Sequence, residues 1–255
     1  MHGNEPSGVI ALLEMEIKLR ERAADMRGMI IGLIGNFRAL EEDVRFIDKD
    51  LNRMWSRDDF PTHWAEVQEK SELSFHLEQL LHGSGERYVL DLHSTSSDTD
   101  PFMSISKTER DKAFAAKFSI PSIAGIDEFI EGPLLGPVSA RGHVGLAFEA
   151  GQHLARRSVE EHKKFISESL YHSGILCEPS FEGGNEDKQF DIVYRHAIKE
   201  GDGFRMQPGY ENFTPVHKGQ PLARDKNGPI LCPMDGLLFM PLYQKQGNDG
   251  FFIIV

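Results

Sequence analysis

The 255-residue sequence has few cysteines and no long hydrophobic run. Its two cysteines, Cys177 and Cys232, lie far apart and match no zinc-binding or redox spacing, so we expect buried free thiols. The absence of any run of roughly eighteen apolar residues excludes a membrane-spanning helix. The first residues also lack the basic and then apolar pattern of a secretion signal, which predicts a cytoplasmic protein.

Positive charge is also scarce. The chain carries 28 lysines and arginines against 40 aspartates and glutamates, which gives a formal net charge of −12. Because no basic stripe is present to neutralise phosphates, we expect neither a nucleic acid nor a membrane as a partner. A small anionic substrate would need arginines placed locally in its binding site. The sequence has no internal repeat, and its length suits one large domain or two smaller ones.

Hydrophobic periodicity predicts that strands alternate with helices over the first part of the chain. Residues 6–24 have the pattern of an amphipathic helix, with Pro6 suited to the first helical position and Asn4 suited to cap it. Further helices are predicted at 64–82, 110–118 and 158–171, and buried strands at 29–34, 88–92 and 144–148. This alternation is typical of an α/β fold with a mostly parallel sheet.

A different pattern begins after residue 183. A polar, glycine-containing segment is followed by short strand-like pieces that Gly and Pro separate, at 191–197, 203–206, 212–216, 236–243 and 250–255. We therefore predict two domains, an α/β domain at residues 1–183 and a small β domain at residues 184–255.

Three residues together suggest a catalytic zinc site. His2 and Glu5 stand three positions apart at the start of the first predicted helix, so both side chains can reach one metal ion. His93 ends the predicted strand 88–92. Two histidines and one carboxylate are a typical catalytic zinc set, with a fourth coordination position left open for water. Taken singly, each of these residues is more often structural, and only their combination favours a metal site.

A charge-dense loop between the predicted helices contributes further candidates. It has few apolar residues, as a solvated loop would. Arg45, Asn52 and Arg53 nevertheless offer forked donors that suit a carboxylate or a developing oxyanion. We expect Asp48 and Asp50 to hold these arginines in place.

Glu149 is the fourth piece of the predicted site. It follows the apolar run 144–148, which places it at the end of a buried strand. Burial would raise the pKa of its carboxyl group and suit it to proton transfer, although a solvated strand end fits the local sequence equally well. We interpret the nearby His143 and His153 as structural residues or as supports of the site.

Four segments together resemble the succinylglutamate desuccinylase/aspartoacylase family, which belongs to the zinc-carboxypeptidase-like hydrolases. They are His2-Gly3-Asn4-Glu5-Pro6-Ser7-Gly8, Arg45-Phe46-Ile47-Asp48-Lys49-Asp50-Leu51-Asn52-Arg53, Leu92-His93-Ser94-Thr95 and Phe148-Glu149-Ala150-Gly151. The resemblance implies a three-layer zinc-carboxypeptidase-like α/β domain with a mixed, mostly parallel sheet at residues 1–183. The part after residue 183 resembles the family's small C-terminal β domain more weakly.

The resemblance also implies a zinc-dependent amidohydrolase that removes an acyl group from a small anionic N-acyl amino acid or a related amine. By motif, one Zn²⁺ per chain would be bound by His2, Glu5 and His93. Glu149 would take a proton from the attacking water and pass it to the leaving amine.

The arginine-rich segment would serve the substrate in such an enzyme. Arg45 would polarise the scissile carbonyl, and Asn52 and Arg53 would hold a substrate carboxylate. Arg141 is a further candidate contact to the substrate, on a looser local match. The acyl group and the amine are not specified by the sequence.

Members of the family normally have an apolar strand directly before the His-x-x-Glu motif, where this sequence has Met1 alone. The loss of such a strand would expose a sheet edge, which a partner chain of a homo-oligomer could cover. We therefore expect His2 to be poorly ordered and the zinc occupancy to be reduced. A non-catalytic or metal-depleted binding protein of the same fold and a peptide carboxypeptidase are the alternatives. The arginine-rich segment favours the acyl-amino-acid branch over the carboxypeptidases.

Overall fold

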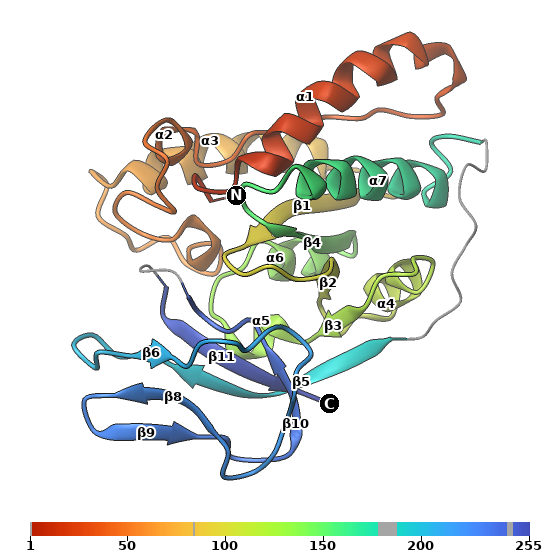
Figure 1. Ribbon diagram of the computed structural model, residues 1–255. Helices are drawn as coiled ribbons and strands as arrows, with labels where there is room; N and C mark the ends of the chain where they lie inside the picture. Colours follow the sequence, from red (N-terminus) through yellow and green to blue (C-terminus); the bar gives the residue numbers. More distant parts are fainter. Residues whose placement is uncertain (1, 84, 178–187, 244–246) are drawn as a thin grey trace.

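The computed structural model describes residues 2–83, 85–177, 188–243 and 247–255, and these residues form two sheets (Figure 1). The larger sheet has eight strands in the order β1-β4-β2-β3-β5-β11-β10-β7. Its strands are β1 (Tyr88–Thr95), β2 (Phe102–Ile105), β3 (Ser122–Ala124), β4 (Val144–Gln152), β5 (Gln189–Ala197), β7 (Pro215–Val216), β10 (Gly236–Phe239) and β11 (Asp249–Ile254). The smaller sheet consists of β6 (Arg205–Met206), β8 (Pro221–Asp225) and β9 (Gly228–Leu231).

The part of the large sheet that begins at β1 is mixed and mostly parallel. β1 runs parallel to β4, and β3 runs parallel to both β2 and β5, whereas β2 is antiparallel to β4. From β5 onward, through β11, β10 and β7, each pairing is antiparallel. The prediction of an α/β fold with a mixed, mostly parallel sheet and additional C-terminal strands is therefore confirmed.

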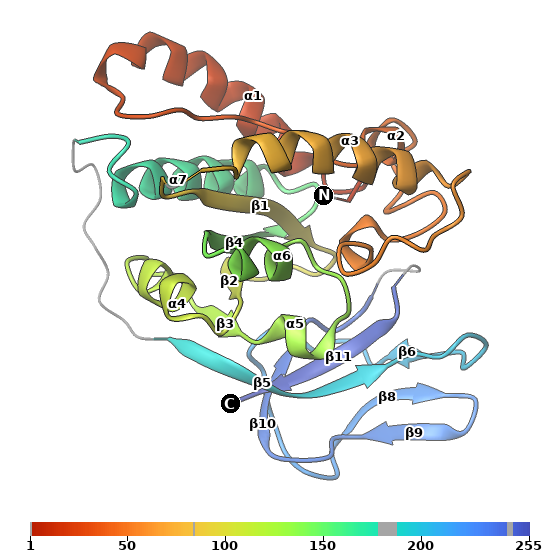
Figure 2. The same cartoon turned by 180° about the vertical axis from the view of Figure 1, so that it is seen from behind.

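Helices cover both faces of the sheet around β1 and β4 (Figures 1 and 2). α1 and α7 pack together over one face, and α3 and α6 lie over the other. Phe148 of β4 stacks on Phe165 of α7 with ring centroids 4.1 Å apart, whereas Gly145 of the same strand meets Leu135 and Val138 of α6. Odd and even residues of β4 thus serve opposite layers.

The helices differ in length. The longer ones are α1 (Pro6–Glu21), α3 (Ala65–Leu80), α4 (Glu109–Ala115) and α7 (Arg156–His172). The shorter α-helices are α2 (Phe37–Glu41), α5 (Ile126–Phe129) and α6 (Leu135–Ala140), and η1 (Ala23–Asp25) and η2 (Leu51–Arg53) are short 3₁₀-helices. None of the helices that the structure describes is long and apolar enough to cross a membrane.

Two apolar clusters hold the C-terminal strands. One lies among these strands and includes Val216, Leu238 and Phe251. The other joins Phe102 of β2 to Phe252 of β11 and so fixes β11 against the rest of the molecule. The predicted domain boundary at residues 183 and 184 falls within 178–187, outside the described residues.

The predicted strand at 29–34 is wrong. The segment forms no ladder in the described structure, and Met29 is 73% exposed. β1 is the end strand of the sheet and has a free edge, but in the described structure this apolar run does not pair with it. Cys177 is exposed, against expectation, whereas Cys232 is buried as predicted.

Candidate active site

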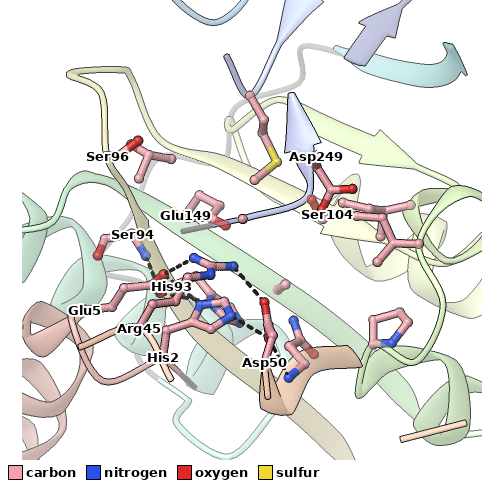
Figure 3. Close-up of a pocket in the computed structure, with 18 of the residues that line it drawn as sticks. His2, Glu5, Arg45, Asp50, His93, Ser94, Ser96, Ser104, Glu149 and Asp249 are labelled. Carbon is pink, nitrogen blue, oxygen red and sulfur yellow. Dashed lines mark hydrogen bonds and ion pairs between the residues drawn. The ribbon is translucent and has the colours of Figure 1, made fainter. Parts of the chain in front are cut away.

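The candidate site is a cavity of about 110 Å³ at the carboxyl ends of β1 and β4 (Figure 3). Ligand sites of open α/β sheets commonly form at this end of parallel strands. The polar lining comes from the chain start, from the loop at 45–53, from the two strand ends, from Ser104 of β2 and from Asn248 and Asp249 at the start of β11. The cavity also has apolar lining residues in or next to α5, α6, β10 and β11, among them Ile126, Ile130, Leu135, Met240, Leu242 and Phe252.

The lining of the cavity includes a cluster of three side chains, those of His2, Glu5 and His93. Nδ1 of His2 lies 2.7 Å from Oε1 of Glu5, and Nδ1 of His93 lies 2.9 Å from Oε2 of the same carboxylate. The backbone N–H of Ser94 also donates to Oε2, at 3.2 Å. All three side chains are buried, and their ligand atoms lie within 4.8 Å of one another. The structure therefore brings the predicted metal ligands together.

Each histidine is supported by a second buried carboxylate on its other ring nitrogen. Nε2 of His2 lies 3.1 Å from Oδ1 of Asp50, and Nε2 of His93 lies 2.9 Å from Oδ2 of Asp91. In both rings Nδ1 thus faces Glu5 while Nε2 faces an aspartate. Such a partner fixes the orientation and tautomer of a metal-binding histidine. Asp91 was missed in the sequence, although it stands two residues before His93 and so on the same face of β1.

Replacement of Asp91 by asparagine should weaken zinc binding about 10- to 100-fold, because His93 would lose the carboxylate that orients it. Competition of the purified variant against a chelator of known zinc affinity measures this change. The exposed Asp98, a few residues further along the chain, provides the control in Asp98→Asn. Equal zinc affinities of the two variants would show that Asp91 does not support the metal ligand.

The charges around the three ligands favour a bound cation. Burial alone would lower the pKa of His93, but the carboxylates of Asp91 and Glu5 raise it to about 10. Burial alone would raise the pKa of Glu5, but His2 and His93 keep it well below its usual value. The site thus stabilises positive charge between buried carboxylates. Two imidazole nitrogens and a carboxylate oxygen are ligands that zinc prefers, so the residues fit this ion.

The chain start is held by close backbone contacts. A Cβ on Gly3 would collide with the backbone of Ala39 and Leu40, and the Gly3 N–H donates to the carbonyl of Arg45 at 3.2 Å. Gly8 lets α1 approach β1 so closely that an added Cβ would lie 3.0 Å from Cβ of Leu92. The segment that carries His2 therefore lies wedged between the loop at 39–45 and β1, and these contacts favour an ordered His2.

Replacement of Gly3 by alanine should lower the free energy of unfolding by about 1–3 kcal/mol, as overpacking typically does. Zinc affinity should fall with it, because the segment that carries His2 and Glu5 must move away from Ala39. Thermal unfolding with and without zinc measures both effects. Gly136 in α6 has no atom within 4 Å of an added Cβ, so Gly136→Ala is the control. Two variants of equal stability would contradict the proposed wedge.

Arg45 lies directly beside the predicted metal ligands. Its Nη1 donates to Oε1 of Glu5 at 3.4 Å, and its Nη2 donates to Oδ2 of Asp50 at 3.2 Å. Its Nε is buried without a hydrogen-bond partner. The expectation that Asp50 holds an arginine is confirmed. The same expectation for Asp48 is wrong, because its carboxylate instead accepts from the Ala65 N–H at 2.7 Å and so caps the start of α3.

Asn52 and Arg53 enter the same cavity from η2. The Asn52 side chain accepts from the Leu134 N–H at 3.0 Å, which ties η2 to the segment before α6. Nη2 of Arg53 donates to Oδ2 of Asp249, the first residue of β11, at 2.7 Å. No local signal marked Asp249, since it lies 196 residues from Arg53.

Glu149 lies beside His93 on the neighbouring strand. The two residues are paired in the parallel register of β1 and β4, and both line the cavity. Oε2 of Glu149 is buried without a hydrogen-bond partner. Burial, together with the negative charge of Glu5, raises the pKa of Glu149 to about 8. A carboxyl group of this kind can both accept and donate a proton near neutral pH.

The structure does not bring Arg141 to the site. Its side chain is exposed, donates to the Pro137 carbonyl at 3.3 Å and does not line the cavity. The physical reason is the length of β4, since Arg141 precedes the strand and Glu149 lies near its far end, with about 3.3 Å of rise per residue. His143 contacts the Leu81 carbonyl at 3.0 Å, while His153 reaches the cavity and contacts the Ser94 hydroxyl at 2.9 Å.

The sequence at residues 1–131, just over half of the chain, matches the succinylglutamate desuccinylase/aspartoacylase catalytic domain. The chain belongs to the succinylglutamate desuccinylase/aspartoacylase family. The resemblance carried by the four sequence segments is thereby confirmed, and the His2–Glu5–His93 cluster lies inside the matched residues.

Two curated relatives share part of the sequence. The N-acyl-aromatic-L-amino acid amidohydrolase (carboxylate-forming) B of Danio rerio is 34% identical over 103 residues, which are 38% of this chain and 33% of that protein. A probable aspartoacylase of Acaryochloris marina (strain MBIC 11017) is 39% identical over 67 residues, which are 26% of this chain and 23% of that protein. The match thus spans a third or less of the length of these relatives.

Solved structures share the fold over a much longer stretch. The product-bound ectoine utilization protein EutE (DoeB) from Ruegeria pomeroyi has a TM-score of 0.73 at 23% identity and covers 100% of this chain and 82% of its own. A point mutant of murine aminoacylase 3 has a TM-score of 0.65 at 18% identity and covers 99% and 90%. The fold of this chain is therefore that of these two proteins.

Proposed function

We propose that this protein is a zinc-dependent amidohydrolase that cleaves the amide bond of an N-acyl amino acid or a related amine. The observation that carries the proposal is the buried cluster of His2, Glu5 and His93, with Glu149 paired beside His93 in the sheet. The reaction adds one water across the amide: the water oxygen bonds to the acyl carbon, the carbon–nitrogen bond breaks, and a proton goes to the nitrogen. The products are a carboxylate and a free amine.

His2, Glu5 and His93 would hold the zinc ion, with Asp50 and Asp91 orienting the two histidines. Zinc in such a site lowers the pKa of a water that it binds to about 7 and offers positive charge to the substrate carbonyl. The protein's own part is to keep both imidazole rings turned with Nδ1 toward Glu5, which the two aspartates do.

Glu149 would carry the proton. Its raised pKa lets the carboxylate take a proton from the attacking water and then, as the carboxylic acid, give it to the leaving nitrogen. The unpaired Oε2 leaves one oxygen of Glu149 available for this exchange. No other buried carboxylate of the cavity lining is free for it, because Glu5, Asp50 and Asp91 all contact histidines in the described structure.

The cationic side chains would bind the substrate. Arg45, with a buried and unpaired Nε beside the metal ligands, is placed to stabilise the oxyanion that forms on the scissile carbonyl. The loss of one such donor typically costs about 3 kcal/mol in the transition state. Arg53 and Asn52 would hold the carboxylate of the amino acid.

Release of free amine from a panel of N-acyl amino acids, with zinc present, tests the proposal. The panel should vary the acyl group from acetyl to succinyl at a fixed amino acid, and then the amino acid from aspartate to aromatic residues at a fixed acyl group. We expect the protein to cleave at least one member of the panel. It should not cleave dipeptides that end in the same amino acids and have a free N-terminus. Cleavage of the dipeptides alone would favour a carboxypeptidase, and no cleavage at all would favour a binding protein.

A further inference from the structure

Arg53 belongs to a chain of ion pairs that reaches into the C-terminal strands. Nη2 of Arg53 donates to Oδ2 of Asp249 at 2.7 Å. The other oxygen of Asp249 accepts from Nε of Arg195 at 2.6 Å, and Nη1 of Arg195 donates to the Phe129 carbonyl at 2.9 Å. Asp249 and Arg195 lie on the paired strands β11 and β5, so the rigid sheet sets the position of this carboxylate.

The contacts leave part of Arg53 available for a ligand. Its Nη1 donates to the Asn52 carbonyl at 2.9 Å, and its Nε is buried without a hydrogen-bond partner. The side chains of Arg53 and Asp249 are each 14% exposed, and both residues line the cavity that holds Glu149. Arg195 does not line it. Asp249 thus binds Nη2 of the Arg53 guanidinium group, whereas Nε of Arg53 keeps an unused hydrogen to donate.

The charge of the cluster matches one carboxylate. Two arginines and one aspartate leave a single net positive charge. Without Asp249, Nη2 of Arg53 would lose its ion pair, and the guanidinium group would no longer be held in one orientation.

We infer that Asp249, itself fixed by Arg195, is a positioning residue that holds the Arg53 guanidinium in place for the substrate carboxylate. The inference rests on the proposed amidohydrolase function and extends it, because the C-terminal strands then determine selectivity for substrates with a carboxylate. Charge-assisted pairs of this kind are short and directional, which suits them to fixing an arginine fork.

The test compares each substrate of the panel with its carboxamide analogue, in which the amino-acid carboxylate is replaced by an uncharged amide. In Asp249→Asn, the preference for carboxylate over carboxamide, as a ratio of kcat/KM values, should fall roughly tenfold or more. Most of the change should lie in a higher KM for the carboxylate substrate. The carboxamide should lose much less of its kcat/KM than the carboxylate substrate does, and a zinc content equal to that of the wild type should show that the variant is folded.

Variants of Arg195 separate positioning from simple charge. Arg195→Ala should lower the same preference, and Arg195→Lys, which keeps the charge and one donor to Asp249, should restore much of it. The exposed pair of Arg57 and Asp59 has the same chemistry outside the cavity, so Asp59→Asn should leave the preference unchanged.

The possible outcomes separate the positioning role of Asp249 from the amidohydrolase function. If the wild-type protein releases amine and Asp249→Asn keeps or increases the preference for the carboxylate, the positioning role is refuted and the amidohydrolase stands. If the wild-type protein cleaves no member of the panel, the proposed function fails and the positioning role falls with it.

Discussion

Replacement of Glu149 by glutamine is expected to lower kcat/KM about a thousandfold while zinc stays bound. General acid–base groups contribute typically about 10²- to 10⁴-fold, and glutamine can neither take the proton from water nor give it to the amine. Glutamine has nearly the same shape, so the cavity should persist. Glu149 is not among the three clustered ligands, so metal content should not change. Parallel measurement of amine release and of zinc per chain checks both statements.

A matched control keeps this prediction specific. Glu168 on α7 is also buried, and burial raises its pKa too, but it lies outside the cavity. Glu168→Gln should therefore retain activity close to wild type. If Glu149→Gln kept more than about a tenth of wild-type activity, a contribution of the size typical for a general base would be excluded and Glu149 would lose its role.

Replacement of His93 by alanine should remove zinc and activity together. The cluster would keep only two ligands, and it would also leave the carboxylate of Asp91 buried without its histidine partner. Because a bound ion stabilises the folded state by mass action, zinc should raise the Tm of the wild-type protein, and a chelator should lower it. In the His93→Ala protein neither addition should shift the Tm. A thermal scan of both proteins with zinc and with chelator measures the difference.

His217 provides the histidine control for this experiment, because its side chain is 82% exposed and does not line the cavity. His217→Ala should bind zinc and respond to chelator as the wild type does. A zinc-dependent rise in Tm that survives in His93→Ala would place the metal at another site and would contradict the proposed ligand set.

Much of the local structure could be predicted from the sequence because its signals are local. The apolar runs before His93 and Glu149 predicted β1 and β4, and helical periodicity predicted α1 and α7. Pairing those two strands in parallel is enough to bring their carboxyl ends to one edge of the sheet. The convergence of His93 and Glu149 therefore follows from features that can be read residue by residue.

The predictions from the sequence were wrong where a residue's structure or position depends on partners that are distant in the sequence. The apolar segment 29–34 has the composition of a strand, but a strand also needs a paired neighbour, and this segment does not pair with the free edge of β1 in the described sheet. The short strands β2 and β3 were missed because three or four residues give little periodicity. Arg141 looked close to Glu149 in sequence, yet most of β4 separates them.

The carboxylates that contact the predicted site residues also differ in how far the sequence could predict them. Asp50 and Asp91 contact the two histidines, and a local pattern could have suggested Asp91, because it shares a strand face with His93. Asp249 is different, because only the pairing of β5 and β11 and their packing against β2 bring its carboxylate to Arg53. Contacts between residues this far apart depend on the assembled core rather than on any segment.

The most direct test of the account is a zinc titration of the metal-free protein in which bound zinc and amine release are followed in the same samples. The account predicts that activity rises in proportion to bound zinc and reaches a plateau at one zinc per chain. Activity that is present before zinc is added, or full zinc binding without any amine release across the panel, would contradict it.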